Sequence, residues 1–431
     1  MSSILIAFGV LYFLGHVLTH FFDKSKIPDV LILIIFGIII GPLLGIVSPA
    51  QIGIAGSVFT SVALIIILFE GGLDLEFTNI RKSAGQSIKL TFAFFFITAA
   101  IIFIIMHFGF NYTPMASAVT GFICGGTSSA VVIPMVGAMK IGKEASTILI
   151  LESALTDVLC IVFTIGVVHS YDSGNFEIGK IIGNLISSLV LASVIGIAAG
   201  MFWLTILNKI RTYQHTTFAT FAFMFIVYGI AEVLNFSGAI AALAFGILLG
   251  NNRTIGILLG RINVNTDKYK DSFQSNIITT PEKKLYKEIV FLIKIFFFIY
   301  LGISIPFEQM HIILIALSIA VAIYAARPVA TKFLVTRHVD AYDRTVIGVM
   351  IPKGLAAAVL AGLPTQHGMI EGPDIQAITY NLVLISIVTT SVLIPLIERT
   401  SVGALMRKFL HTRNLPGAYQ EKKTTNTDDK A

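Results

Sequence analysis

The stretch LESALTDVLC, residues 151–160, carries two carboxylates, Glu152 and Asp157, in a run of otherwise apolar or small side chains. An unpartnered ion in such a setting costs at least a few kcal/mol. On an α-helix, five residues of spacing put the two carboxylates about 140° apart around the axis, whereas Glu152 shares a face with Thr156, and Ser153 shares one with Asp157. The geometry therefore disfavours a paired acid/base dyad. It predicts one carboxylate in a structural ion pair and the other lining a water-accessible cavity.

A buried carboxylate needs a basic partner at similar depth, and three apolar segments offer one. They contain Arg327 in AIYAARPVATKF, Lys353 in GVMIPKGLAAAVLAG and Lys294 in FLIKIFFFIYLGISI. Arginine suits the task best, because its planar fork donates two charge-assisted hydrogen bonds and it keeps its proton. We therefore predict an ion pair between Glu152 and Arg327; the alternative for Arg327 is extension to the cytoplasmic surface. Lys294 lies close to the cytoplasmic end of its segment, so we expect it to reach the surface.

Two apolar segments, residues 120–137 and 348–364, are interrupted near their middles. The first contains two glycines followed by three hydroxyl residues, 127–129, and the second contains IPKG around Lys353. Glycine and proline at mid-depth free backbone groups, which persist only where they line a cavity or are buried in protein. A pair of interrupted segments predicts a binding site near the middle of the membrane, with Lys353 neutralising carbonyl ends of half-helices. The alternative is a packing kink in which small residues let helices approach closely.

The elements that position these groups are apolar helices. Of the 431 residues, 55% are hydrophobic and only 13% are charged, against about a quarter charged in soluble domains. The fold class predicted is an all-α polytopic membrane protein with about thirteen transmembrane helices. The expected spans are 3–22, 29–47, 52–69, 87–108, 115–138, 145–168, 181–207, 216–236, 238–250, 288–305, 309–333, 345–363 and 375–397. The first lacks a basic stretch before it and a cleavage site after it, so we expect a retained span.

The charges between spans alternate, which predicts the orientation. Basic residues follow the odd-numbered spans, and the intervening connections are neutral or acidic. The positive-inside rule then puts the basic loops in the cytoplasm, the N-terminus outside and the C-terminus inside the plasma membrane. We expect a membrane transporter domain over residues 1–400 and a polar, disordered cytoplasmic tail over 401–431. The hydrophilic connection 251–287 is either a solvated linker or a regulatory segment.

Seven segments recur in an order that resembles a known family. They are LFEGGLDLE (68–76), GGTSSAVV (125–132), ESALTD (152–157), LNFSGAIAALAFGILLGN (234–251), FFFIYLGISI (296–305), ARPVA (326–330) and PKGLAAAVLA (352–361). Together they resemble the monovalent cation/proton antiporter superfamily, nearest its NhaP-type sodium/proton antiporters. The resemblance covers residues 1 to about 400.

This resemblance implies thirteen spans in an inverted repeat, with a dimerisation domain and a core domain, in a homodimer that serves pH homeostasis. Two discontinuous helices would cross in the core, matching spans 115–138 and 345–363. The resemblance puts ion and proton exchange on Asp157, the stabilising ion pair on Glu152 and Arg327, and a basic residue of the second crossing helix on Lys353. The family usually has Asn-Asp or Asp-Asp where this sequence has Thr156-Asp157. One carboxylate therefore remains to exchange.

The mechanism that we expect is competition at Asp157, which binds either one proton or one alkali cation and never both. Hard cations prefer oxygen ligands, so hydroxyls of Thr156, Thr127, Ser153 and Ser128 are the expected further ligands. Na⁺ or Li⁺ is favoured, and one exchanging carboxylate predicts electroneutral exchange of one cation for one proton.

Other functions stay open at this stage. They are a potassium/proton antiporter or K⁺ efflux system, and a sodium-coupled organic anion symporter. We expect no cofactor and no nucleic-acid partner, because the basic residues are scattered between spans. An enzyme is disfavoured because the sequence offers no set of nucleophile, base and orienting residue.

Overall fold

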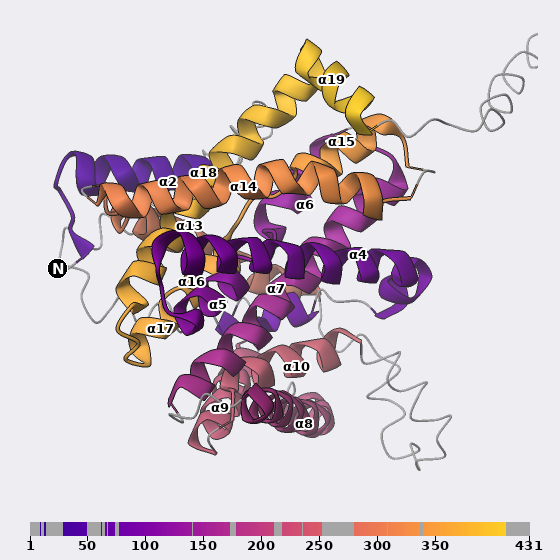
Figure 1. Cartoon of the computed structure of the whole chain (residues 1–431). Helices are drawn as coiled ribbons and strands as arrows, with labels where there is room; N and C mark the ends of the chain where they lie inside the picture. Colours follow the sequence, from indigo (N-terminus) through magenta and orange to yellow (C-terminus); the bar gives the residue numbers. More distant parts are fainter. Residues whose placement is uncertain are drawn as a thin grey trace, which may run out of the picture.

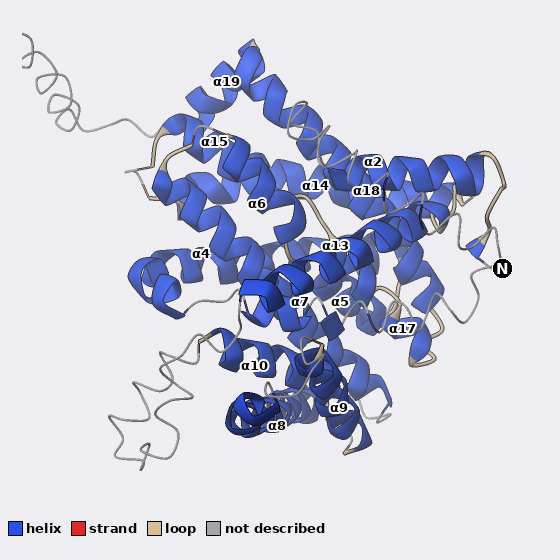
Figure 2. Ribbon diagram, turned by 180° about the vertical axis from the view of Figure 1, so that it is seen from behind, coloured by secondary structure: helices blue, strands red, loops and turns tan. Residues whose placement is uncertain are grey.

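The computed structural model describes residues 9, 13, 29–49, 62, 65–66, 68–73, 77–139, 141–172, 178–210, 218–234, 236–251, 280–307, 309–336 and 339–410. Every regular element in these residues is helical (Figures 1 and 2), in agreement with the predicted all-α class. Most of the predicted spans 3–22 and 52–69, the greater part of the 251–287 connection and the end of the tail lie outside the described residues.

The described helices follow one another in a simple order. They are α2 (Asp29–Ile38), the π-helix η1 (Ile39–Leu43), α4 (Phe77–Ile104), the π-helix η2 (Ile105–Gly109), α5 (Pro114–Ile123), α6 (Ser129–Ala138), α7 (Lys143–Asp172), α8 (Ile178–Ile210), α9 (Ala219–Val233), α10 (Gly238–Gly250), α13 (Thr280–Ile303), α14 (Met310–Leu334), α15 (Ala341–Val349), α16 (Leu355–Leu360), α17 (Leu363–Gln366), α18 (Gly372–Arg399) and α19 (Ser401–Leu410).

Five of the described helices are long and apolar enough to cross a membrane. They are Ser87–Gly109, Lys143–Val168, Val190–Leu207, Met310–Leu334 and Gly372–Ile397. The predicted count of thirteen is therefore not confirmed. Of the eight other predicted spans, 3–22 and 52–69 lie mostly outside the described residues. Spans 29–47, 216–236 and 238–250 correspond to apolar helices of 10–17 residues, the interrupted spans 115–138 and 345–363 form short helices, and α13 carries charged residues in its first half.

The helices form two groups that meet at α7. Helices α8, α9 and α10 pack on one another and lie together at the bottom of Figure 1, whereas α4, α5, α14, α15 and α18 lie above them. Helix α7 contacts α4, α5 and α6 on one side and α8 and α10 on the other. Both carboxylates of the opening stretch are therefore held on an element that spans the two groups.

Helices α2 and α13 approach so closely that glycine is required at their contact. A Cβ added at Gly302 would meet the carbonyl oxygen of Ile34, and one at Gly37 would meet the carbonyl oxygen of Ile299. Small residues of this kind let apolar helices pack backbone to backbone where the hydrophobic effect cannot drive association. This contact fixes α13, which contributes to the site described below.

The start of α5 is defined by its cap and tied to the start of α18. Thr113 Oγ1 accepts a hydrogen bond from the Ala116 amide at 3.2 Å, and Pro114 occupies the first turn, as is usual at helix N-termini. Glu371, which precedes α18, accepts hydrogen bonds from the Thr113 amide at 2.9 Å and from its hydroxyl at 2.6 Å. Two elements far apart in the sequence are thereby fixed end to end.

The prediction that the tail, residues 401–431, is disordered is wrong for its first ten residues. They form α19, which packs against α15 and α18 and buries Leu410. The Leu410 carbonyl accepts a hydrogen bond at 3.2 Å from Nη1 of Arg344 on α15. Apolar residues at positions 402, 405, 406, 409 and 410 recur with the spacing of an amphipathic helix. The polar composition of the whole tail hides this pattern.

Candidate functional site

The two carboxylates of α7 have different surroundings. Glu152 Oε2 accepts a hydrogen bond from Arg327 Nη2 at 2.6 Å, and the two side chains are 2% and 3% exposed. Arg327 also donates from Nε to the Ile347 carbonyl at 3.3 Å, and its guanidinium carbon lies 3.6 Å from the centre of the Phe94 ring. The structure thus brings the predicted pair into contact and joins α7 to α14, α15 and α4.

Both interrupted segments are broken where they pass each other. The first breaks between α5 and α6 at residues 124–128, and the second between α15 and α16 at residues 350–354. The Ser128 amide donates to the Pro352 carbonyl at 2.7 Å, which joins the two breaks directly. A Cβ at Gly354 would meet the Oγ and Cβ of Ser128, so only glycine fits at this point.

Lys353 links the same two breaks in the opposite direction. Its side chain is 1% exposed, and Nζ donates to the Gly126 carbonyl at 2.9 Å. Gly126 follows the last turn of α5, where the helix dipole is negative. The Lys353 amide in turn donates to Ser386 Oγ on α18 at 2.8 Å. The ammonium group of the second interrupted segment therefore provides a hydrogen-bond donor for a carbonyl at the break in the first.

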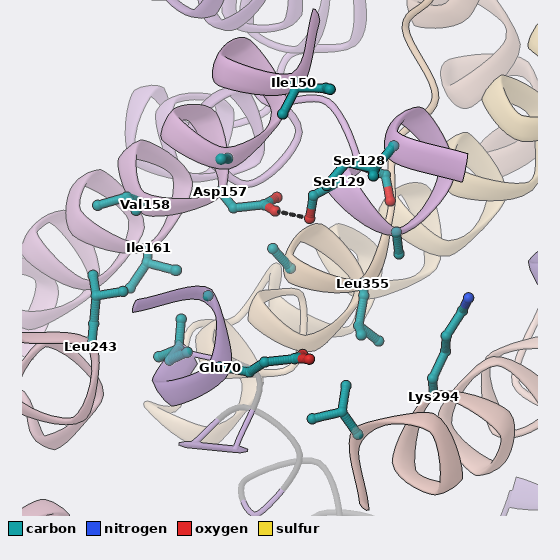
Figure 3. A pocket seen from close by; sticks show the side chains of 17 residues that line it. Glu70, Ser128, Ser129, Ile150, Asp157, Val158, Ile161, Leu243, Lys294 and Leu355 are labelled. Carbon is teal, nitrogen blue, oxygen red and sulfur yellow. Dashed lines mark hydrogen bonds between the residues drawn. The ribbon is translucent and has the colours of Figure 1, made fainter. Parts of the chain in front are cut away.

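Asp157 faces a cavity of about 400 Å³ beside this crossing (Figure 3). Its Oδ2 accepts a hydrogen bond at 2.6 Å from the hydroxyl of Ser129, the first residue of α6. Ser128 also lines the cavity, and its buried Oγ has no hydrogen-bond partner within the described structure. An orphaned hydroxyl next to a carboxylate in a cavity is a set of oxygen donors that a hard cation could complete.

The other predicted ligands have roles elsewhere. Thr156 Oγ1 accepts from the Thr127 amide at 3.1 Å and donates to the Ser153 carbonyl at 3.3 Å. Ser153 Oγ donates to the Ile150 carbonyl at 3.0 Å. Thr156, Thr127 and Ser153 do not line the cavity that Asp157 faces. The bond between Thr127 and Thr156 joins the first break to α7, whereas the Ser153 hydroxyl bonds within α7.

Three residues at the cavity were not predicted as part of the site. They are Ser129, which bonds Asp157, and two charged residues of the cavity wall, Glu70 and Lys294. Lys294, which was expected to reach the membrane surface, is a partly exposed residue of the cavity wall. The sequence could have indicated Glu70, because it is an acidic residue directly after the apolar run 52–69.

Comparison with known proteins identifies the family. The family profile described as "Sodium/hydrogen exchanger, transmembrane" matches residues 9–399. The chain belongs to the sodium/hydrogen exchanger family. Among curated members, it is 26% identical over 371 residues to the probable Na⁺/H⁺ antiporter 2 of Methanocaldococcus jannaschii, covering 82% of this chain and 83% of that protein.

A second relative of this exchanger has a different cation in its name. The K⁺/H⁺ antiporter NhaP of Alkalimonas amylolytica is 22% identical over 406 residues, covering 89% of this chain and 64% of that protein. The fold is similar to that of the sodium proton antiporter MjNhaP1 from M. jannaschii at pH 8, with a TM-score of 0.72 and 20% identity, covering 91% of this chain and 99% of that one.

Family membership confirms the resemblance drawn from the seven segments. It establishes an integral membrane protein of a family of cation/proton antiporters. The named relatives are transporters and not enzymes, which agrees with the expectation for this chain.

Proposed function

We propose that this exchanger couples one Na⁺ or Li⁺ to one proton through competition at Asp157. The observation that carries the proposal is the position of Asp157: it is the carboxylate of α7 that lines the cavity and accepts a hydrogen bond from Ser129 at the first broken segment. When ionised, it would bind the cation together with the hydroxyls of Ser128 and Ser129. When protonated, it is neutral and holds no cation. The site changes its exposure only in these neutral forms, because a bare carboxylate is costly to move through a region of low dielectric constant.

The surroundings assign supporting roles to the other polar residues. Glu152 and Arg327 neutralise each other, so that α7 carries one carboxylate into the cavity. Lys353 holds the two breaks together without lining the cavity. The bond between Thr156 and Thr127 joins the first break to α7, and we propose that this contact positions Asp157.

Topology and assembly belong to the same proposal. We propose thirteen spans in an inverted repeat, in the plasma membrane, with the N-terminus outside and the C-terminus in the cytoplasm, and a homodimer. The charge alternation between spans supports this orientation. In this orientation the cytoplasmic end of α7 is its start at Lys143. Asp157 is fourteen residues further along, which corresponds to about 21 Å of helix.

The second candidate is exchange of K⁺ for protons. The relative named as a K⁺/H⁺ antiporter favours it. Symport of an organic anion has less support, because the described wall of the cavity holds two carboxylates and one ammonium group, and Lys353 is directed elsewhere.

A proton-flux assay with purified protein in liposomes tests the proposal. A pH-sensitive dye inside the vesicles should report proton movement when Na⁺ or Li⁺ is added, and less when K⁺ is added. An imposed membrane potential should leave the rate unchanged, because equal charges cross in both directions. A larger response to K⁺ would favour the second candidate, and a current that scales with Na⁺ would refute one-for-one exchange.

The carboxylate assignment has its own test. Asp157→Asn should abolish cation-driven proton flux, because an amide neither ionises nor exchanges a proton. Glu144→Gln is the matched control, since Glu144 is an exposed carboxylate in the first turn of the same helix and should be dispensable. If Asp157→Asn still exchanges cations, the assignment is wrong.

A further inference from the structure

Helix α19 begins where a helix suited to crossing the membrane ends. It follows α18, whose segment Gly372–Ile397 is long and apolar enough to span a bilayer. It also contacts the last turn of α14, whose segment Met310–Leu334 meets the same criteria, through Lys332 and Phe409. Figure 1 shows α19 at the edge of the molecule, beyond the end of α18 and beside α15. Because it meets the ends of two such segments, α19 lies at a membrane surface.

The exposed face of α19 has an apolar half and a basic half. At 100° per residue, Leu405 and Phe409 are neighbours on this face. They are 69% and 46% exposed, whereas Leu410 on the opposite face is buried. Lys408, which is exposed, lies on the other side of Leu405, and the half-buried Arg407 follows at the edge of the face. A helix with this pattern lies between acyl chains and headgroups, because its apolar half enters the first and its basic half reaches the second.

The charge around α19 is positive. Residues 399–413 contain four Lys and Arg residues and no Asp or Glu. Lys332 adds a further cation from the last turn of α14, with Nζ 4.4 Å from the centre of the Phe409 ring. Among the residues that the structure describes, no acidic side chain forms an ion pair with Arg407 or Lys408. A basic surface beside exposed apolar side chains is complementary to a leaflet that contains anionic phospholipids.

We propose that the basic half of α19 binds the phosphate groups of anionic phospholipids through Arg407, Lys408 and Lys332. The apolar half, Leu405 and Phe409, enters the acyl chains of the same leaflet. Hydrogen bonds from guanidinium and ammonium groups to phosphate oxygens are of the strong, charge-assisted kind. This site goes beyond the proposed ion exchange and does not depend on it, because none of these residues lines the cavity at Asp157.

Quenching of a tryptophan on α19 by brominated lipids tests the proposal. Leu405→Trp is made in a Trp203→Phe background, which removes the single natural tryptophan. The full-length protein is reconstituted in phosphatidylcholine vesicles that contain increasing fractions of brominated phosphatidylcholine or brominated phosphatidylglycerol. Comparison of the two quenching curves gives the preference for the anionic lipid at α19. Iodide in the buffer reports exposure of the same tryptophan to water.

The proposal expects a preference for brominated phosphatidylglycerol on the order of tenfold, since each basic residue near an anionic surface contributes up to about fivefold. The preference should decrease at high salt. Arg407→Gln/Lys408→Gln should lose most of it. Lys287→Gln is the matched control, because it removes an exposed lysine from α13, and it should keep the preference. Size-exclusion elution in detergent establishes that each variant is folded.

Three results would overturn the proposal. The first is equal quenching by the two brominated lipids, and the second is quenching by iodide alone, which would place this face in water. The third is a double variant that keeps the preference, or a Lys287→Gln variant that loses it to the same extent. Native mass spectrometry of the protein with its natural tryptophan gives an independent measurement. The double variant should retain fewer phosphatidylglycerol molecules than Lys287→Gln, and equal retention would contradict the site.

Discussion

Breaking the pair between Glu152 and Arg327 should destabilise the fold strongly, and removing both charges should cost much less than the sum of the two single losses. The side chains are 2% and 3% exposed, so neither can be hydrated after its partner is removed. Removing one partner of such a pair costs about 3–5 kcal/mol. Arg327→Met leaves the Glu152 carboxylate buried and also loses the contacts to the Ile347 carbonyl and the Phe94 ring. Glu152→Gln leaves a guanidinium that cannot lose its proton.

The double variant Glu152→Gln/Arg327→Met leaves no buried charge. Its loss should be close to that of one single variant, so that the coupling free energy between the two sites is about 3 kcal/mol. The measurement is unfolding of the purified protein in detergent, followed by tryptophan fluorescence or by loss of the monodisperse elution peak. Glu144→Gln, an exposed carboxylate in the same helix, should stay within about 0.5 kcal/mol of the wild type. Strictly additive losses in the double variant would show that the pair is not coupled and refute the reasoning.

Two further predictions concern the crossing and its cytoplasmic end. Gly354→Ala should lower the free energy of unfolding by about 1–3 kcal/mol and impair exchange, because the added Cβ would meet the Oγ and Cβ of Ser128. Adding Ser128→Gly to this variant should restore stability in a melting assay. A double variant that stays destabilised would contradict this contact. Burial raises the pKa of Asp343, in the first turn of α15 and outside the predicted span 345–363, above its ordinary 3.8, although the hydrogen bond from the Gly142 amide opposes the rise. The contribution of Asp343 to stability is therefore fully present below pH 3.8 and is lost as pH rises through the higher folded-state pKa. Asp343→Asn should flatten this decline in melting temperature as pH rises above 3.8, and an unchanged profile would exclude Asp343 as its source.

The parts of the site that could be predicted depend on rules that act along one helix. The spacing of Glu152 and Asp157 separates their faces, and the chemistry of arginine selects Arg327 as the partner. Glycine and proline likewise indicate where the crossing segments break. Each of these follows from local geometry or from the cost of burying a charge.

The remaining parts depend on where other segments lie. Ser153 shares a face with Asp157, yet its hydroxyl bonds the Ile150 carbonyl, as serines in helices often do. Ser129 reaches Asp157 instead, from a different element. Lys294 lines the cavity from α13, which begins at Thr280 and not at residue 288, where the span was expected to start. The contribution of this helix to the cavity wall depends on how it packs against distant segments.

The docking of α19 on α15 has a practical consequence for handling the protein. Nη1 of the buried Arg344 donates to the last carbonyl of α19, at Leu410, while Nη2 donates to the Thr336 carbonyl at 2.6 Å. Cutting the chain after Arg399 would take away one acceptor of this guanidinium and uncover the neighbouring half-helix. An affinity tag or fluorescent fusion should therefore be joined beyond Leu410, where it leaves this anchor intact.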